Sequence, residues 1–271
     1  IKQTLDQLKS NLNDIVHEII VVDDNSSDST PKIIESFNNV TLIQNNINKG
    51  YGASIKTGVK KSKFSSIAIT DADGTYPNEK IPEFYQMFEE NNLDMIVGSR
   101  TGSNVHIPLV RRPAKWLLGK LANYIVSENI PDINSGLRIF KKKSFIKFLT
   151  IIPNGFSLTT TITLGMISGG FKVKFEEIDY FKRSGKSKIR PIHDTINFFK
   201  LILRIGLYFS PKKIFTPISI ILFFVALSWG LISKFYFGNL ADVSVLLLTI
   251  ASFQTMLFAL LAELINTRFP N

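Results

Sequence analysis

The sequence has no cysteine and only three histidines in 271 residues. Without cysteine the chain has no disulfide framework and no thiolate chemistry, which is compatible with a domain that faces the cytoplasm. The histidines are scattered and lack the spacing of metal ligands, so we assign no catalytic role to His17, His106 or His193. No internal repeat or low-complexity segment stands out.

The sequence also lacks an initiator methionine, and residues 1–5 are predicted to lie in the middle of a helix. We therefore expect that further residues precede Ile1. The length allows one sizeable domain with an appendage, because single hydrophobic cores usually stop growing at about 250 residues.

Positive charge predominates, since 32 Lys and Arg against 22 Asp and Glu give a net charge of +10. Such a balance suggests an anionic partner. Residues 172–213 hold eleven basic and four acidic residues and lead directly into an apolar tail, which favours contact with lipid headgroups. This stretch lacks the interleaved aromatic side chains on which the bases of single-stranded nucleic acid stack, so we expect no nucleic-acid partner.

The tail contains two apolar runs, at residues 214–237 and 243–265. Each is long enough to cross a hydrocarbon core of about 30 Å as a helix. They predict a transmembrane hairpin; the alternative is a buried helix pair of a soluble protein. Lys212 and Lys213 precede the runs and Arg268 follows them, whereas the link carries only Asp242. The positive-inside tendency then places the preceding domain in the cytoplasm.

Residues 191–213 precede the first run and repeat apolar side chains at helical spacing. These side chains are Ile192, Ile196, Phe199, Leu203 and Leu207, with Lys200 and Arg204 between them. The pattern predicts an amphipathic helix in the membrane interface, and packing against the preceding domain explains it equally well. The expected organisation is a domain over 1–190, this helix over 191–213, and the hairpin over 214–271.

The first half of the chain alternates short β-branched runs with helical patterns. Strands are expected at 18–22, 40–44, 66–70 and 94–98, and helices at 29–37, 51–62 and 78–91. This alternation predicts an α/β fold with a mostly parallel sheet and a ligand crevice at the carboxyl ends of its strands.

Two aspartates follow the third expected strand. Asp71 and Asp73 are two residues apart, so an extended backbone points both carboxylates to the same side. Mg²⁺ and Mn²⁺ favour carboxylate oxygens together with substrate phosphates, and the pair therefore suits a metal that bridges a nucleotide diphosphate. Turn-forming aspartates near glycine are the alternative.

A second acidic strand end lies upstream, at Asp23 and Asp24. Asp24 is expected to face the crevice, where it could hydrogen-bond a base or ribose. Asp28 or Ser29 is expected to cap the following helix, because Pro31 suits its first turn.

Five motifs occur along the chain in a characteristic order. They are Val-Val-Asp-Asp-Asn-Ser-Ser-Asp-Ser-Thr (21–30), Asn-Lys-Gly-Tyr-Gly-Ala (48–53), Asp-Ala-Asp-Gly-Thr-Tyr-Pro (71–77), Val-Gly-Ser-Arg (97–100) and Asn-Ser-Gly-Leu-Arg (134–138). The set resembles family 2 glycosyltransferases, in particular the dolichyl-phosphate mannose or glucose synthase branch.

This resemblance covers roughly residues 1–190 and implies a Rossmann-like GT-A fold with helices on both faces of the sheet. It implies inverting transfer of a hexose from GDP-mannose or UDP-glucose to a polyprenyl or dolichyl phosphate. It also implies that Asp71 and Asp73 bind Mg²⁺ or Mn²⁺ and that Asp24 contacts the nucleoside. Lys49, Gly50 and Ser135 lie in the motifs and are expected to bind substrate.

The chain departs from this family in two places. The family's first strand, with its Pro-x-Tyr-Asn-Glu signature, is absent from these residues and is expected before Ile1. Mannose synthases of this type commonly have a Gln as a further metal ligand where this chain has Thr75, a weaker ligand. The Gln-x-x-Arg-Trp signature of processive polysaccharide synthases does not occur, which argues against a chitin- or cellulose-type synthase.

An acceptor phosphate requires a cationic pocket, and guanidinium groups bind phosphate oxygens bidentately. Arg100 and Arg138 are the favoured candidates because they lie inside motifs. Arg111 and Arg112 are further candidates, although they could equally form a solvated helix start.

A Gly- and Ser-containing basic segment at 183–188 suggests a loop that closes over the phosphates through Arg183, Lys186 and Lys188, with a solvated linker as the alternative. Two other functions stay open. One is transfer to a lipid or carbohydrate hydroxyl, which would need a general base. The other is a non-catalytic membrane adaptor that keeps a transferase fold.

Overall fold

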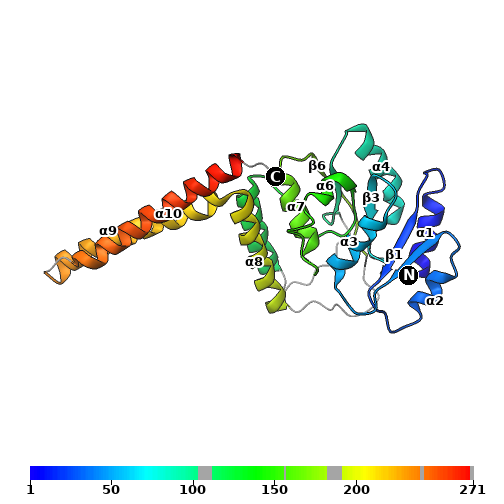
Figure 1. The fold of residues 1–271 in the computed structure, drawn as a ribbon, viewed down its shortest axis with the longest axis horizontal. Coiled ribbons are helices and arrows are strands. Elements are labelled where there is room, and N and C mark those ends of the chain that lie inside the picture. The colour runs from blue at the N-terminus through cyan, green and yellow to red at the C-terminus, as the bar shows by residue number, and fades with distance from the viewer. Residues whose placement is uncertain (103–111, 156, 182–190, 239–240, 269–271) are drawn as a thin grey trace. The chain divides into compact units, whose positions relative to one another are not determined.

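The computed structural model describes residues 1–102, 112–155, 157–181, 191–238 and 241–268. It divides into two compact units, Ile1–Leu201 and Ile202–Asn271. The first unit is an α/β domain and the second contains two long helices (Figure 1).

The elements follow one another in an order that begins with a helix and ends with the helix pair. The helices are α1 (Lys2–Asn11), α2 (Thr30–Glu35), α3 (Tyr51–Lys61), the 3₁₀ turn η1 (Asn78–Lys80), α4 (Ile81–Glu90), α5 (Arg112–Val126), α6 (Lys142–Ile146), α7 (Leu158–Ser168), α8 (Pro191–Phe209), α9 (Pro211–Tyr236) and α10 (Asp242–Arg268). The strands are β1 (Ile19–Asp23), β2 (Val40–Gln44), β3 (Ser66–Ile69), β4 (Met95–Ser99), β5 (Arg138–Lys141) and β6 (Val173–Glu177).

Every strand and helix expected in the first hundred residues is confirmed, with ends that differ by at most three residues. Of the two residues expected to cap α2, Ser29 occupies the N-cap position without a side-chain cap hydrogen bond, and the Asp28 carboxylate accepts the Thr30 amide at 2.9 Å.

The expected α/β fold is confirmed, and in the main sheet β5 runs against the other three strands. The strand order of this sheet is β3-β5-β4-β6; β4 and β6 are parallel, whereas β5 is antiparallel to both β3 and β4. The chain between β4 and β5 returns at the edge where β4 ends, since the Gly98 amide donates to the Leu137 carbonyl at 2.9 Å. β5 must therefore run back across the sheet.

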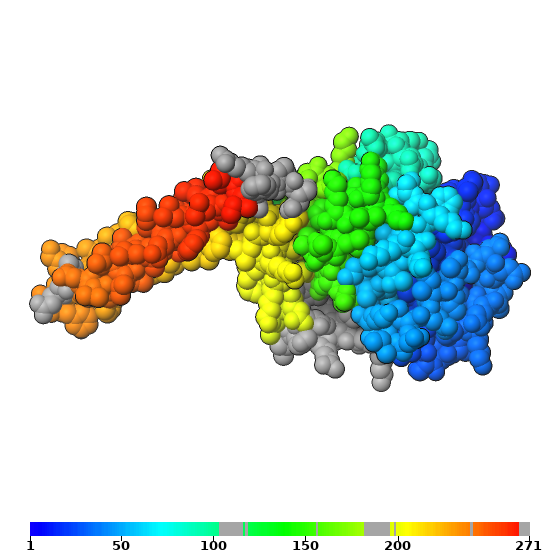
Figure 2. All heavy atoms as spheres, viewed as in Figure 1, coloured from blue at the N-terminus to red at the C-terminus, as the bar shows by residue number. Residues whose placement is uncertain are grey.

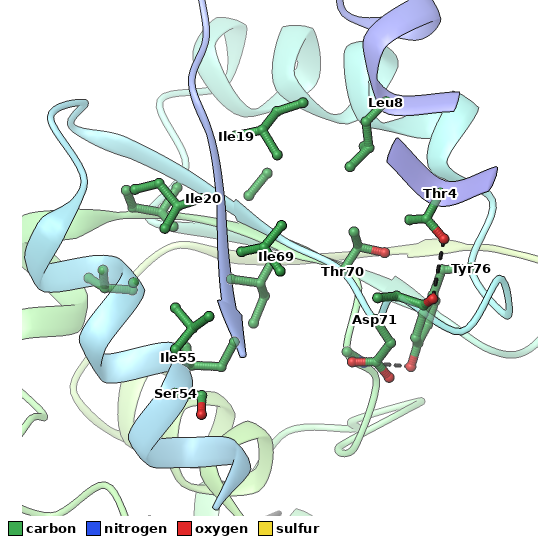
Figure 3. A pocket seen from close by; sticks show the side chains of 18 of the residues that line it. Thr4, Leu8, Ile19, Ile20, Ser54, Ile55, Ile69, Thr70, Asp71 and Tyr76 are labelled. Carbon is green, nitrogen blue, oxygen red and sulfur yellow. Dashed lines mark hydrogen bonds between the residues drawn. The ribbon is translucent and has the colours of Figure 1, made fainter. Parts of the chain in front are cut away.

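The other two strands, β1 and β2, form a separate parallel sheet. Within the described residues β1 pairs only with β2, and β3 only with β5. A cavity of about 1250 Å³ is lined by both β1 and β3. Figure 3 shows Ile20 of β1, Ile55 of α3 and Ile69 of β3 around it. The expectation that a strand precedes Ile1 stays a prediction.

The core of the α/β domain lies where α4 packs on the main sheet. β4 is completely buried along its length, and α4 presents Ile81, Phe84 and Phe88, which are at most 4% exposed. Their spacing of three and four residues places them on one helix face, against Ile96 and Ile139 of the sheet.

The second unit contains the end of α8 and the helices α9 and α10, whose atoms lie side by side in Figure 2. α9 and the Asp242–Ile265 part of α10 are both strongly apolar, with a mean hydropathy of 2.1 over 18 residues. Both are long enough to cross a membrane. Ser219 and Ser252 hold the helices together, because each hydroxyl donates to the other residue's carbonyl at 2.8 and 2.9 Å. Most other side chains of the pair are apolar and exposed, as a lipid environment requires.

Gly52 offers a test of the packing. A Cβ at this position of α3 would lie 2.2 Å from the Pro153 carbonyl oxygen, a contact that requires backbone movement. Gly52→Ala should therefore lower the free energy of unfolding by about 1–3 kcal/mol in urea unfolding of the detergent-solubilised chain.

Gly119→Ala is the matched control, since no atom lies within 4 Å of its Cβ position in α5. It should leave stability unchanged or raise it by about 0.5–1 kcal/mol through helix propensity. Equal effects of the two substitutions would contradict the packing described for α3.

Candidate active site

Acidic side chains that follow two strands line the large cavity. Asp24 follows β1, and Asp71 and Asp73 follow β3; all three line the cavity, together with Tyr51 at the start of α3 and Arg100 after β4. The carboxyl ends of β1, β3 and β4 thus supply polar groups to the cavity, as α/β folds usually arrange them.

Asp71 lies in a confined space that a glycine keeps open. A Cβ on Gly136 would lie 3.1 Å from both carboxylate oxygens of Asp71, so any side chain there would press on this group. The Gly136 amide donates to the Tyr76 hydroxyl at 2.6 Å, and Asp71 and Tyr76 point toward one another in Figure 3. Segment 134–138 and the turn after β3 therefore form one wall of the site.

Asp73 is oriented by its own turn. Its Oδ1 accepts the Thr75 hydroxyl at 2.6 Å and the Thr75 amide at 3.2 Å. Thr75 is 0% exposed. The hydroxyl expected to ligate a metal is thus turned to Asp73, and the geometry favours a positioning role for Thr75.

The donor set fits a hard divalent cation that takes its other ligands from a substrate. The described residues contain no group of three His, Cys, Asp or Glu side chains able to enclose a metal. Asp71 and Asp73 supply two carboxylates beside the cavity, and Mg²⁺ characteristically binds one or two carboxylates plus substrate phosphates. The assignment of Mg²⁺ or Mn²⁺ to this pair stays a prediction.

Asp24 binds a loop of its own chain. Its Oδ1 accepts the Asn45 side-chain amide and the Lys49 backbone amide, both at 2.9 Å, and its Oδ2 accepts the Gly50 amide at 2.7 Å. Desolvation opposes the charged form, but these hydrogen bonds outweigh it and hold the pKa of Asp24 below its ordinary value. Lys49 and Gly50 thus contact Asp24 through their amides, and a direct role of Asp24 in nucleoside binding stays a prediction.

Arg100 is paired with an aspartate that sequence analysis missed. Its Nε and Nη2 donate to the two oxygens of Asp132 at 2.6 and 2.9 Å, and its guanidinium lies 5.1 Å from the ring centre of Tyr180. The Asp132 side chain is 0% exposed and that of Arg100 17%. Arg100 is therefore held rigidly at the cavity wall. Asp132 stands two residues before the Asn-Ser-Gly-Leu-Arg motif, a proximity that could have indicated it.

Arg138 lies beneath the site, not in it, which disagrees with its expected contact with the acceptor phosphate. It is 0% exposed and donates to the Ser135 carbonyl, the Thr159 carbonyl and the Thr163 hydroxyl. Burial lowers its pKa to about 10, so it stays charged at neutral pH. Ser135 is likewise 0% exposed, and we assign both residues to the support of the loop.

Helix α7 supplies that support, and no sequence pattern revealed it. All its residues except the last are buried, so it has no polar face to give a helical period. The Thr160 hydroxyl donates to the Asn134 side chain. Arg138 donates to the Thr159 carbonyl and to the Thr163 hydroxyl. The threonines thus anchor the loop from below.

Several expected phosphate-binding residues cannot be placed. Arg111, Arg183, Lys186 and Lys188 lie outside the described residues. Arg112 is the first residue of α5. Their contact with an acceptor stays a prediction.

Comparison with known protein families gives two matches. Residues 1–149, more than half of the chain, match glycosyl transferase family 2. Residues 210–267 match the GtrB C-terminal hairpin family, which coincides with α9 and α10.

Curated relatives include two proteins of Haloferax volcanii. The chain is 27% identical over 266 residues to the low-salt glycan biosynthesis hexosyltransferase Agl6, covering 95% of this chain and 64% of that protein. It is 24% identical over 191 residues to a dolichyl-phosphate hexose transferase, covering 70% of this chain and 81% of that protein. The chain thus spans less than two thirds of Agl6.

Solved structures with the same fold include the glucosyl-3-phosphoglycerate synthase of Mycobacterium tuberculosis, in complex with Mn²⁺, uridine diphosphate and phosphoglyceric acid. The TM-score is 0.58 at 13% identity, over 76% of this chain and 73% of that one. At this identity the similarity establishes the GT-A fold of the first unit.

The Arg100–Asp132 pair yields a stability prediction. Asp132→Asn keeps the side-chain volume but leaves the largely buried Arg100 cation without its counter-charge, and it should cost about 3 kcal/mol of unfolding free energy. Glu83→Gln, which breaks the exposed Lys80–Glu83 pair, should change stability by less than about 0.5 kcal/mol. Urea unfolding measures both, and similar small losses would contradict the structural role of the pair.

The lowered pKa of Asp24 predicts a pH-dependent contribution to stability. A carboxyl group whose folded pKa is depressed stabilises the fold above its unfolded pKa, near 3.8 here, and this stabilisation is lost as pH falls through the folded pKa. Asp24→Asn should therefore destabilise the protein at pH 7 and make a smaller difference near pH 3, in denaturant unfolding at both values. A loss of equal size at both pH values would refute this assignment.

Proposed function

Because the chain belongs to glycosyl transferase family 2, we propose that it transfers a hexose from a nucleotide-sugar to a polyprenyl phosphate at a membrane surface. The observation that carries this proposal is a carboxylate-lined cavity in a chain that continues into two apolar helices. The dolichyl-phosphate hexose transferase among its relatives supports the same acceptor class.

The proposed reaction is a direct displacement. An oxygen of the acceptor phosphate attacks the anomeric carbon, the bond from that carbon to the nucleoside diphosphate breaks, and the configuration inverts. A phosphate monoester is largely ionised near neutral pH, since its second pKa is about 6, so no general base is required. The protein contributes positioning and electrostatic stabilisation.

The two aspartates would hold Mg²⁺ or Mn²⁺. When bound, such a cation offsets the negative charge that develops on the departing diphosphate. Thr75 keeps Asp73 in its orientation, and Gly136 leaves the space around Asp71 open. Asp24 lines the cavity and holds the 45–50 loop through its carboxylate, and we assign it to the nucleoside side.

The acceptor side requires positive charge. Arg100 lines the cavity and is fixed by Asp132, so we assign it to the acceptor phosphate. Arg111, Arg112, Arg183, Lys186 and Lys188 are proposed to complete this pocket. Arg138 contributes indirectly, through the loop that it supports.

The membrane arrangement follows from the tail. We place α9 and α10 across the bilayer and the first unit in the cytoplasm, since the basic residues Lys212, Lys213 and Arg268 flank the spans. Along α8, Ile196, Phe199 and Leu207 are 43–49% exposed, which suits a helix in the membrane interface. The domain limits of 1–190, 191–213 and 214–271 belong to this proposal.

The proposal predicts metal-dependent labelling of a lipid. The purified chain in detergent is incubated with polyprenyl phosphate and radiolabelled GDP-mannose or UDP-glucose, with Mg²⁺, Mn²⁺ or a chelator. Asp73→Asn should lower the transfer rate at least about a hundredfold, because it removes charge from the site at nearly constant volume. Glu79→Gln, an exposed acid-to-amide change in η1, should retain the wild-type rate.

The acceptor panel identifies the alternatives. Labelling of diacylglycerol or of a carbohydrate hydroxyl, with none of polyprenyl phosphate, would move the activity to hydroxyl acceptors. A folded protein that transfers no sugar from any nucleotide-sugar would instead support a non-catalytic membrane adaptor.

A further inference from the structure

Tyr51 begins α3 on a backbone that is enclosed from two sides. On one side, the amide of the preceding Gly50 donates to Asp24 at 2.7 Å. On the other, a Cβ on Gly50 would lie 2.6 Å from the Asn154 carbonyl oxygen, and the Ala53 amide donates to that oxygen at 3.0 Å. Gly50 also has a φ of 97°, which favours glycine. The Cα of Tyr51 therefore has little freedom to move.

The side chain of Tyr51 extends to the metal-side carboxylate. Its hydroxyl forms a hydrogen bond with Asp71. A tyrosine hydroxyl is protonated at neutral pH and a carboxylate only accepts, so Tyr51 is the donor in this hydrogen bond. Tyr51 thus approaches Asp71 from α3, while Gly136 lies against the carboxylate from segment 134–138.

Asp71 stands in an irregular turn after β3, where Tyr76 also points toward its carboxylate (Figure 3), so Tyr51 approaches it as a further partner from α3. A carboxylate can rotate about its terminal torsion, and metal binding requires one rotational state to persist. A hydroxyl that holds one side of the group selects that state.

We infer that Tyr51 is a positioning residue that orients the Asp71 carboxylate for a divalent cation and links it mechanically to the Asp24 loop. This inference rests on the proposed function. The link runs through consecutive contacts: Asp24 holds the Lys49 and Gly50 amides, Gly50 leads into Tyr51, and Tyr51 holds Asp71. A change on the nucleoside side of the cavity is thereby transmitted to the cation side.

The test measures binding of Mn²⁺ alone to the full chain in detergent, from the electron paramagnetic resonance signal of the free ion. Tyr51→Phe removes one oxygen atom and should weaken Mn²⁺ binding at least about tenfold, the usual effect of losing a hydrogen-bond partner of a metal ligand. Tyr124→Phe, on the exposed side of α5, is the matched control and should bind as the wild type does.

A second variant tests the link. Asp24→Asn should weaken Mn²⁺ binding in the wild-type background and have little further effect when combined with Tyr51→Phe, because both act through the same contacts. If thermal unfolding shows that Tyr51→Phe does not fold, Mn²⁺ binding by Asp24→Asn alone tests whether the Asp24 loop is linked to the cation site.

The outcomes separate the two proposals. Wild-type protein that binds no Mn²⁺, either alone or with uridine or guanosine diphosphate, would remove the metal site and with it the basis of this inference. Wild-type binding that Tyr51→Phe leaves unchanged would overturn the role of Tyr51 and leave the metal site standing. A lower unfolding temperature with unchanged Mn²⁺ affinity would make Tyr51 merely structural.

Discussion

The antiparallel pairing of β5 with β3 and β4 brings segment 132–138 back to the edge of the sheet where the acidic strand ends lie. A parallel strand would have placed this segment at the opposite edge. The return places Gly136 against Asp71 and Asp132 against Arg100. Both the cation side and the acceptor side of the proposed site therefore depend on this single reversal of the chain.

Charged groups inside the domain hold the loops of the site. Arg138 is enclosed beneath the 134–136 loop, and the Asp132 carboxylate is buried beside Arg100. Burying a charge is costly unless it is hydrogen-bonded. Carbonyl and hydroxyl oxygens accept from both Nη atoms of Arg138, whose Nε has no hydrogen-bond partner among the described residues, and Arg100 pairs with Asp132. These contacts fix the loops around the cavity, which is the preorganisation that electrostatic catalysis requires.

Periodicity and turn chemistry were sufficient to predict the first four strands, the helices between them and the hairpin. They also predicted that Asp71 and Asp73 follow a strand at the cavity. They missed α7 because its residues are buried all round, and β5 because four residues carry no clear alternation. Burial explains why Arg138 lies away from the cavity. Motif membership located Arg138 and Thr75 at the site, but only the structure reveals which partner each side chain meets.

The most direct measurement is an experimental structure of the full chain with Mn²⁺ and uridine or guanosine diphosphate, in which anomalous scattering locates the metal. The account predicts one Mn²⁺ peak between the diphosphate and the carboxylates of Asp71 and Asp73, with the nucleoside beside the 45–50 loop. A nucleotide bound elsewhere, or a Mn²⁺ peak away from both aspartates, would contradict it.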